Sequence, residues 1–134
     1  MIALLTTARA TLLRASLVLL AFVSLNSCGK PVEIDYAKLK YSSDGLFLDP
    51  ATQKPFTGVA LEHYPNGQLS KEFHIKNGKF HGVAREWYKS GQPSSVTEFT
   101  DGEHNGKNTE WNENGSLYME RVYDHEKIVT QKKY

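Results

Sequence analysis

The chain has 134 residues and a formal net charge of +1 at pH 7, and 40% of its residues are hydrophobic. Nucleic-acid-binding proteins usually carry a concentrated basic patch, and this near-neutral charge balance argues against one, so no nucleic-acid partner is expected. Cys28 is the only cysteine, which excludes a disulfide bond within the chain. The length is that of a chain with one small domain.

Residues 1–27 have the layout of a secretory signal peptide. No acidic residue occurs in residues 1–25, and Arg9 and Arg14 precede an apolar stretch of eleven residues at 15–25. A positive flank followed by a short apolar core is typical of such signals. The stretch is shorter than the about 20 apolar residues of a membrane-spanning helix. We therefore expect export of the chain from the cytoplasm.

Cys28 ends this segment in the sequence Leu-Asn-Ser-Cys, which resembles the lipobox of bacterial lipoproteins. The resemblance implies that the Cys28 sulfur carries diacylglycerol, that Cys28 begins the mature protein, and that the chain is anchored to a membrane of the cell envelope. Two or more acyl chains hold a protein stably on a membrane. Gly29 is not acidic, which fits the outer membrane in a host with two membranes. The alternatives are an uncleaved amphipathic anchor and an ordinary signal peptide that is cleaved nearby.

Residues 28–45 are expected to form a tether that leads into the first strand, and residues 46–134 to form a repeat domain. Glycines recur there in columns 24 residues apart: Gly58, Gly82 and Gly106; Gly67, Gly91 and Gly115; Gly78 and Gly102, continued by Glu126. Equal spacing in independent columns indicates one short unit that is copied without insertion or deletion. The copies span about residues 58–81, 82–105 and 106–129, and the third, which departs from the pattern at several positions, is expected to act as a cap.

Each copy is predicted to be a β-hairpin. Asn66-Gly67 and Asn114-Gly115 are favoured pairs for two-residue hairpin loops, in which both residues have positive φ. Asn77-Gly78 and Asp101-Gly102 are predicted to be the return turns into the next copy. The runs between the turns are rich in β-branched and aromatic residues.

A two-residue loop at Asn66-Gly67 would place Tyr64 opposite Leu69 and Glu62 opposite Lys71, which would pair opposite charges across the strands. The predicted fold is all-β: an elongated, twisted, single-layer meander of tandem antiparallel hairpins.

No catalytic, cofactor or metal site is indicated. The five histidines have no recognised metal-ligand spacing, and no second cysteine is present. Glu62, Glu86 and Glu110 recur at the repeat period, so a solvated ladder of carboxylates is a sufficient explanation of that column. The sequence contains neither a nucleophile elbow nor a phosphate-binding glycine loop. We expect a protein that is not an enzyme and that binds no cofactor and no metal ion.

Four aromatic residues on neighbouring hairpins form the candidate binding surface: Tyr64, Tyr88, Trp87 and Trp111. Tryptophan and tyrosine are enriched at the energetic centres of protein interfaces. They also supply packing that a single hairpin lacks. We expect the tryptophan column to pack. The tyrosine column faces the other way by strand alternation, so at least one of the two columns is expected to be accessible.

The segments YPNGQLSKE, NGKFHG and REWYKSGQ resemble the bacterial variant of the MORN repeat, and the resemblance extends from about Leu46 to Lys127. Many proteins of that group are regarded as antitoxins of the YwqK type. The resemblance implies a hairpin-repeat fold, and it allows varied functions.

The expected function is that of a lipid-anchored protein-binding or scaffold module in the cell envelope, which acts by contact and without chemistry. The alternatives are an antitoxin or immunity protein that neutralises a toxin by direct binding, and a module that binds lipid or glycan through its aromatic residues. An envelope hydrolase would need a cleft of clustered titratable groups, which the sequence does not indicate.

Overall fold

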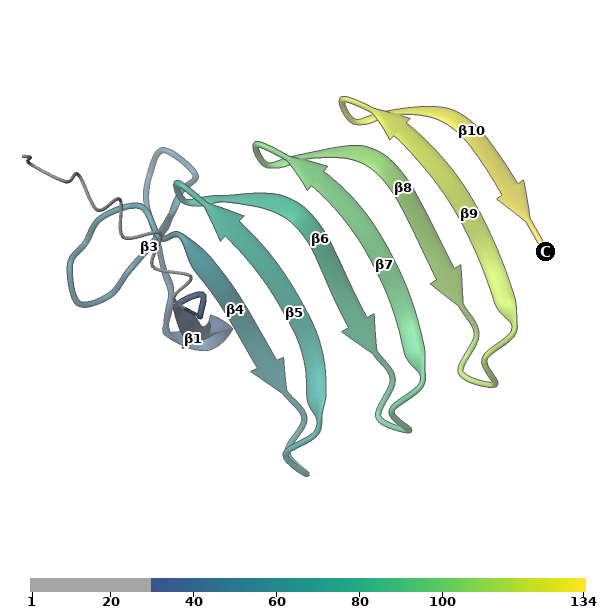
Figure 1. The fold of residues 1–134 in the computed structure, drawn as a ribbon, viewed down its shortest axis with the longest axis horizontal. Helices are drawn as coiled ribbons and strands as arrows, with labels where there is room; N and C mark the ends of the chain where they lie inside the picture. Colours follow the sequence, from purple (N-terminus) through teal and green to yellow (C-terminus); the bar gives the residue numbers. More distant parts are fainter. Residues whose placement is uncertain (1–29) are drawn as a thin grey trace, which may run out of the picture.

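The computed structural model describes residues 30–134. The expected signal peptide and Cys28 lie outside the described residues. An eight-stranded sheet in the order β1-β4-β5-β6-β7-β8-β9-β10 dominates the fold, with a small two-stranded sheet of β2 and β3 beside it (Figure 1). The sheet is open, and the all-β prediction is confirmed.

The elements, in chain order, are β1 (Glu33–Asp35), the 3-10 turn η1 (Tyr36–Lys38), β2 (Lys40–Tyr41), β3 (Phe47–Leu48), β4 (Gly58–His63), β5 (Leu69–Lys76), β6 (Lys79–Trp87), β7 (Pro93–Thr100), β8 (Glu103–Trp111), β9 (Leu117–Asp124) and β10 (Lys127–Lys133). Neighbouring strands from β4 to β10 run antiparallel, as expected, and β1 adds to β4 in parallel. The meander is therefore a mixed sheet at its first edge.

The return turns have the predicted chemistry. Asn77 and Gly78 have φ values of 51° and 78°, and Asp101 and Gly102 have values of 51° and 94°. Positive φ at both central residues is the mark of the tight turn that matches the twist of a hairpin. These turns connect β5 to β6 and β7 to β8.

The prediction of two-residue loops at the other hairpin ends is wrong. The Tyr64 N–H donates to the Gln68 carbonyl at 2.8 Å, the Gly67 N–H donates to the Tyr64 carbonyl at 2.8 Å, and Asn66 is absent from the residues with positive φ. This pattern is a type I turn followed by a glycine bulge. Pro65 suits the second position of such a turn, and the Asn66 side chain accepts from the Gln68 N–H at 3.1 Å.

The longer loop changes the register that we expected. Leu69 lies opposite His63 rather than Tyr64, whereas Glu62 lies opposite Lys71 as predicted, and the Lys71 ammonium is 3.4 Å from the Glu62 carboxylate. One residue of β5, Ser70, is skipped between these pairs. The same bulge recurs in the next two hairpins, where Ser94 and Tyr118 are skipped.

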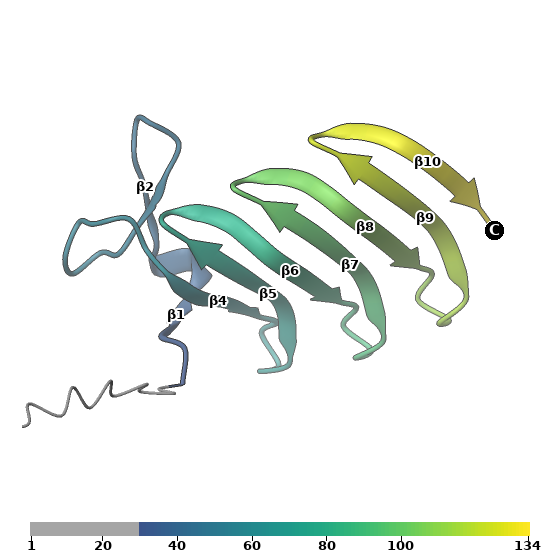
Figure 2. The ribbon, with the colours of Figure 1, turned by 45° about the horizontal axis from the view of Figure 1, so that its top comes forward.

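The hydrophobic core lies at the β4 end of the sheet. Phe56, Ala60 and Ile75 are 3%, 0% and 3% exposed, and side chains of the N-terminal segment pack against them: Ile34, Tyr36, Leu39 and Phe47. The segment gathers over the first strands, whereas β7 to β10 stand as a single layer (Figures 1 and 2). The described N-terminal segment thus covers one part of the sheet, and no segment within residues 30–134 covers the other part.

Candidate functional site

The two predicted tyrosines connect successive hairpins. The Tyr64 hydroxyl donates to the backbone carbonyl of Trp87 at 2.6 Å, and the Tyr88 hydroxyl donates to that of Trp111 at 2.7 Å. Each bond joins a tyrosine of one repeat to the backbone of the residue 23 positions later, in the next repeat, and both bonds are partly buried. The tyrosine column therefore holds adjacent repeats in register, and all four predicted aromatic residues are half-buried.

Aromatic ring contacts run through a different set of residues, which sequence reasoning did not identify. The contacting rings, in order across the sheet, are Tyr36, Phe73, Phe80, Phe99, His104 and Tyr123, and successive centroids are 5.0, 5.0, 5.4, 4.6 and 5.1 Å apart. Phe47 contacts both Tyr36 and Phe80. We call the sheet side that carries these rings the ring face. The N-terminal segment covers the ring face over β4 to β6.

A row of six residues, paired in register from strand to strand, crosses the ring face near the hairpin loops at residues 64–68, 88–92 and 112–116; we call it the polar row. The paired residues are, in order, Glu62, Lys71, Glu86, Ser95, Glu110 and Met119. Residues in register on antiparallel strands project from the same side of a sheet and are close neighbours. The glutamate column noted in the sequence is therefore interleaved with a second column, whose members are lysine, serine and methionine.

An open hollow of about 420 Å³ lies over the middle of this row. Its lining residues are Glu86, Tyr88, Ser94, Ser95, Glu110, Trp111, Asn112 and Tyr118. We call it the Ser95 hollow. It brings together two of the four predicted surface residues, Tyr88 and Trp111, and adds two carboxylates, whereas Tyr64 and Trp87 do not line it.

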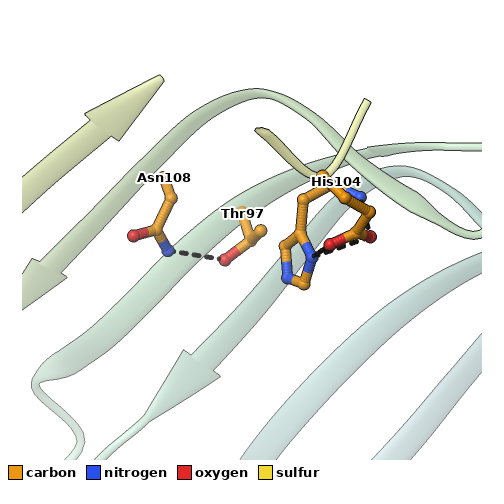
Figure 3. A network of polar contacts seen from close by, with 4 residues as sticks. Thr97, His104 and Asn108 are labelled. Atoms are coloured by element: carbon orange, nitrogen blue, oxygen red, sulfur yellow. Dashed lines mark hydrogen bonds and ion pairs between the residues drawn. The ribbon is translucent and has the colours of Figure 1, made fainter. Parts of the chain in front are cut away.

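One wall of the Ser95 hollow is held by a polar network. The Arg121 guanidinium donates to the Glu110 carboxylate and to the Asn108 side-chain carbonyl at 3.0 Å. The Asn108 amide donates in turn to the Thr97 hydroxyl at 2.9 Å, and both residues are buried (Figure 3). Buried polar groups that are fully bonded fix side-chain positions, so Glu110 is held in place and its charge is compensated.

A second network fastens the last return turn to the sheet. The Glu126 carboxylate accepts from the His104 N–H at 2.7 Å and lies 2.9 Å from the His104 ring nitrogen Nδ1 (Figure 3). The backbone hydrogen bond and then the side-chain contact of His104 lower the pKa of the Glu126 carboxyl below its usual value. Glu126 stands where the other copies have glycine, and its φ of 65° lies in the left-handed region that favours glycine. The contacts of its carboxylate with His104 hold the turn in this conformation.

The opposite face of the sheet carries ion pairs between neighbouring strands. Arg85 and Glu72 form an ion pair at 2.6 Å, and Lys107 and Glu120 form another at 2.8 Å. Hydrogen bonding to Glu120, followed by its charge, raises the pKa of the Lys107 ammonium. These contacts resemble the cross-strand pairs common on exposed sheet faces.

Within residues 30–134, no group of three or more His, Cys, Asp or Glu side chains is placed to hold a metal ion. No helix in the same described part of the chain is long and apolar enough to cross a membrane.

Comparison with protein families finds two matches to the MORN repeat variant, at residues 56–77 and 80–101. The matches begin 24 residues apart and cover most of the first two copies. Two segments of the chain are therefore similar to the MORN repeat variant, and repeats of this kind are generally membrane- or protein-binding modules. Comparison with curated proteins and with solved structures finds no match.

Proposed function

We propose that this protein is a lipid-anchored module that holds a protein partner in the cell envelope by contact, without catalysing a reaction. The observation that carries the proposal is the uneven cover of the ring face. The N-terminal segment packs over β4 to β6. Over β7 to β9 the same face bears rings, a polar row and the Ser95 hollow, and no described segment lies over it in either view (Figures 1 and 2).

The surface over β7 to β9 has the chemistry of a protein-binding site. It combines half-buried aromatic residues such as Phe99 and Tyr123 with the charged side chains Glu110 and Arg121. Aromatic residues and arginine are enriched at interface centres. The cross-repeat tyrosine bonds and the Thr97–Asn108 contact hold this surface rigid, and a rigid surface loses little conformational entropy on binding.

The membrane anchor is part of the proposal and rests on Cys28. β1 begins at Glu33, so a lipidated Cys28 would lie at most about 18 Å from the covered edge of the sheet along an extended chain. The covered end would then stand near the membrane, and β7 to β10 would extend away from it. In this orientation the uncovered ring face is accessible to other envelope proteins.

The anchor is tested by membrane fractionation and N-terminal mass analysis of the native protein and of the variants Cys28→Ala and Ser43→Ala. We expect the native chain and the Ser43→Ala control to begin at an acylated Cys28 in the membrane fraction. Cys28→Ala is expected to leave that fraction or to stay unprocessed. A native chain that is soluble and intact from Met1 would contradict the anchor.

The partner contact is tested by incorporating a photoreactive amino acid in cells, either at Asn112, which lines the Ser95 hollow, or at Lys107. Lys107 alternates with Asn108 along β8 and so projects from the opposite face. We expect one discrete cross-linked protein from Asn112 and none from Lys107. Equal products from both positions, or none from either, would contradict contact through the ring face.

A further inference from the structure

The first repeat shows what fits between two glutamates of the polar row. Lys71 lies in register between Glu62 and Glu86. Its ammonium is 3.4 Å from the Glu62 carboxylate, and the two side chains are 38% and 41% exposed. At this position the protein itself supplies a cation between two carboxylates.

The second repeat has the same pair of flanking glutamates but no lysine between them. Ser95 occupies the position 24 residues after Lys71 and lies in register between Glu86 and Glu110. A serine side chain is three non-hydrogen atoms shorter than a lysine side chain and carries no charge. The Ser95 hollow lies where a lysine at residue 95 would extend, and its volume of about 420 Å³ is ample for a lysine side chain.

The two carboxylates of the Ser95 hollow differ in their charge balance. Glu110 is paired with Arg121. Glu86 makes no ion pair with any side chain of residues 30–134. The residues lining the hollow include no lysine, arginine or histidine. Glu86, on the wall of the hollow, therefore has no direct ion-pair partner among the described residues, although Lys71 lies in register beside it, and this favours a cationic occupant.

The remaining lining residues suit an ammonium group as well. Tyr88, Trp111 and Tyr118 are aromatic, and Ser94, Ser95 and Asn112 offer polar oxygens. Aromatic faces attract cations, and an ammonium group donates up to three hydrogen bonds to oxygen acceptors. An anionic or purely apolar group would instead leave Glu86 unpaired or repelled.

We propose that the Ser95 hollow binds a lysine side chain of the protein partner, which takes the place that Lys71 occupies in the first repeat. This inference rests on the proposed function and deepens it by naming the residue type that the partner inserts. Glu86 supplies the main charge contact, Glu110 the second, and the aromatic residues surround the methylene stem.

The test uses the full chain in detergent, with Nα-acetyl-lysine methylamide as the probe and the norleucine analogue, which has a similar side chain but no charge, as its control. Binding is followed by the amide chemical shifts of Ser95 and Glu110. We expect saturable shifts with the lysine compound only. Glu86→Gln is expected to weaken this binding by about fivefold, the effect of one partly exposed charge pair, whereas Glu62→Gln, the same change in the first repeat, leaves it unchanged.

The decisive variant is Ser95→Lys, which supplies the cation from within. It is expected to abolish binding of the lysine compound while the other amide shifts stay native. Lys71→Ser is expected to create a second site, reported by new shifts at residue 71. Equal shifts with both compounds, no shifts with either, or native binding by Ser95→Lys would overturn the inference. If the wild-type protein still forms its specific cross-link from Asn112 in that case, the proposed function stands and only the lysine assignment fails.

Discussion

Replacing Tyr88 by phenylalanine removes one hydroxyl group and tests whether the tyrosines hold the repeats together. That hydroxyl donates at 2.7 Å to the Trp111 carbonyl, a partly buried bond between the second and third repeats. A neutral hydrogen bond of this kind contributes about 1 kcal/mol. For a domain of this size, such a loss lowers the melting temperature by about 4–8 °C. The expected Tm of Tyr88→Phe is lower by that amount.

The matched control is Tyr118→Phe, because the Tyr118 hydroxyl has no hydrogen-bond partner among the described residues and its ring lies near the Lys133 ammonium, at 5.3 Å. Thermal unfolding followed by circular dichroism measures both variants under identical conditions. We expect the control to change the free energy of unfolding by less than about 0.5 kcal/mol. A Tyr88→Phe protein as stable as the native one, or an equal loss in Tyr118→Phe, would refute the role assigned to the hydroxyl.

Two further changes test the ends of the sheet. The pKa of Glu126 is lowered in the folded state by its hydrogen bonds from His104, so its contribution to stability is present above the usual carboxyl pKa and is lost as the pH falls through the lower, folded value. In urea unfolding at several pH values, Glu126→Gln should therefore lose less stability on acidification than the native protein, and an unchanged pH profile would contradict this. A Cβ on Gly58 would lie 2.3 Å from the Val32 carbonyl oxygen and 2.7 Å from a Phe56 ring carbon, so Gly58→Ala should displace β1 and cost about 1–3 kcal/mol. Faster hydrogen exchange of the Val59 N–H, which donates to Val32 at 2.8 Å, checks this, and native exchange rates at Val59 would show that β1 stays in place.

The strands and return turns could be predicted because their signals are local. At Asn77-Gly78 and Asp101-Gly102 the chain needs positive φ at two consecutive residues, and few residue pairs satisfy that requirement. The period of 24 residues then repeats the same hairpin along the chain. The family matches begin at the same interval.

The loop and bulge at each hairpin end could not be predicted, because an Asn-Gly pair suits more than one turn. In the loop Tyr64–Gln68, the type of turn depends on Pro65 and on the hydrogen bond from the Gln68 N–H to the Asn66 side chain. The result moves the partner of Leu69 by one residue. Register errors of this size place side chains on the wrong face of a sheet.

The arrangement of the Ser95 hollow depends on that register, so the sequence predicted only part of it. Glu86 and Glu110 were recognised as a column, but their position on either side of Ser95 follows from pairing across three strands. The ring contacts of Phe73, Phe80 and Phe99 join residues on both sides of the return turns and belong to no single repeat column. The packing of residues 34–47 on the first strands is a contact between segments far apart in the sequence, so the periodic pattern of the repeats does not predict it.

The most direct test of the account is thiol labelling of two single substitutions, Ser95→Cys on the uncovered ring face and Val122→Cys on the opposite face. Arg121 pairs with Asn108 on the ring face, so Val122, which is 41% exposed, projects the other way. A maleimide is applied to the purified protein and to intact envelopes. A lipid-bearing Cys28 would not react. The account predicts that envelopes slow the labelling of Ser95→Cys but not that of Val122→Cys; an equal ratio of the two rates in both preparations would contradict a partner on the ring face.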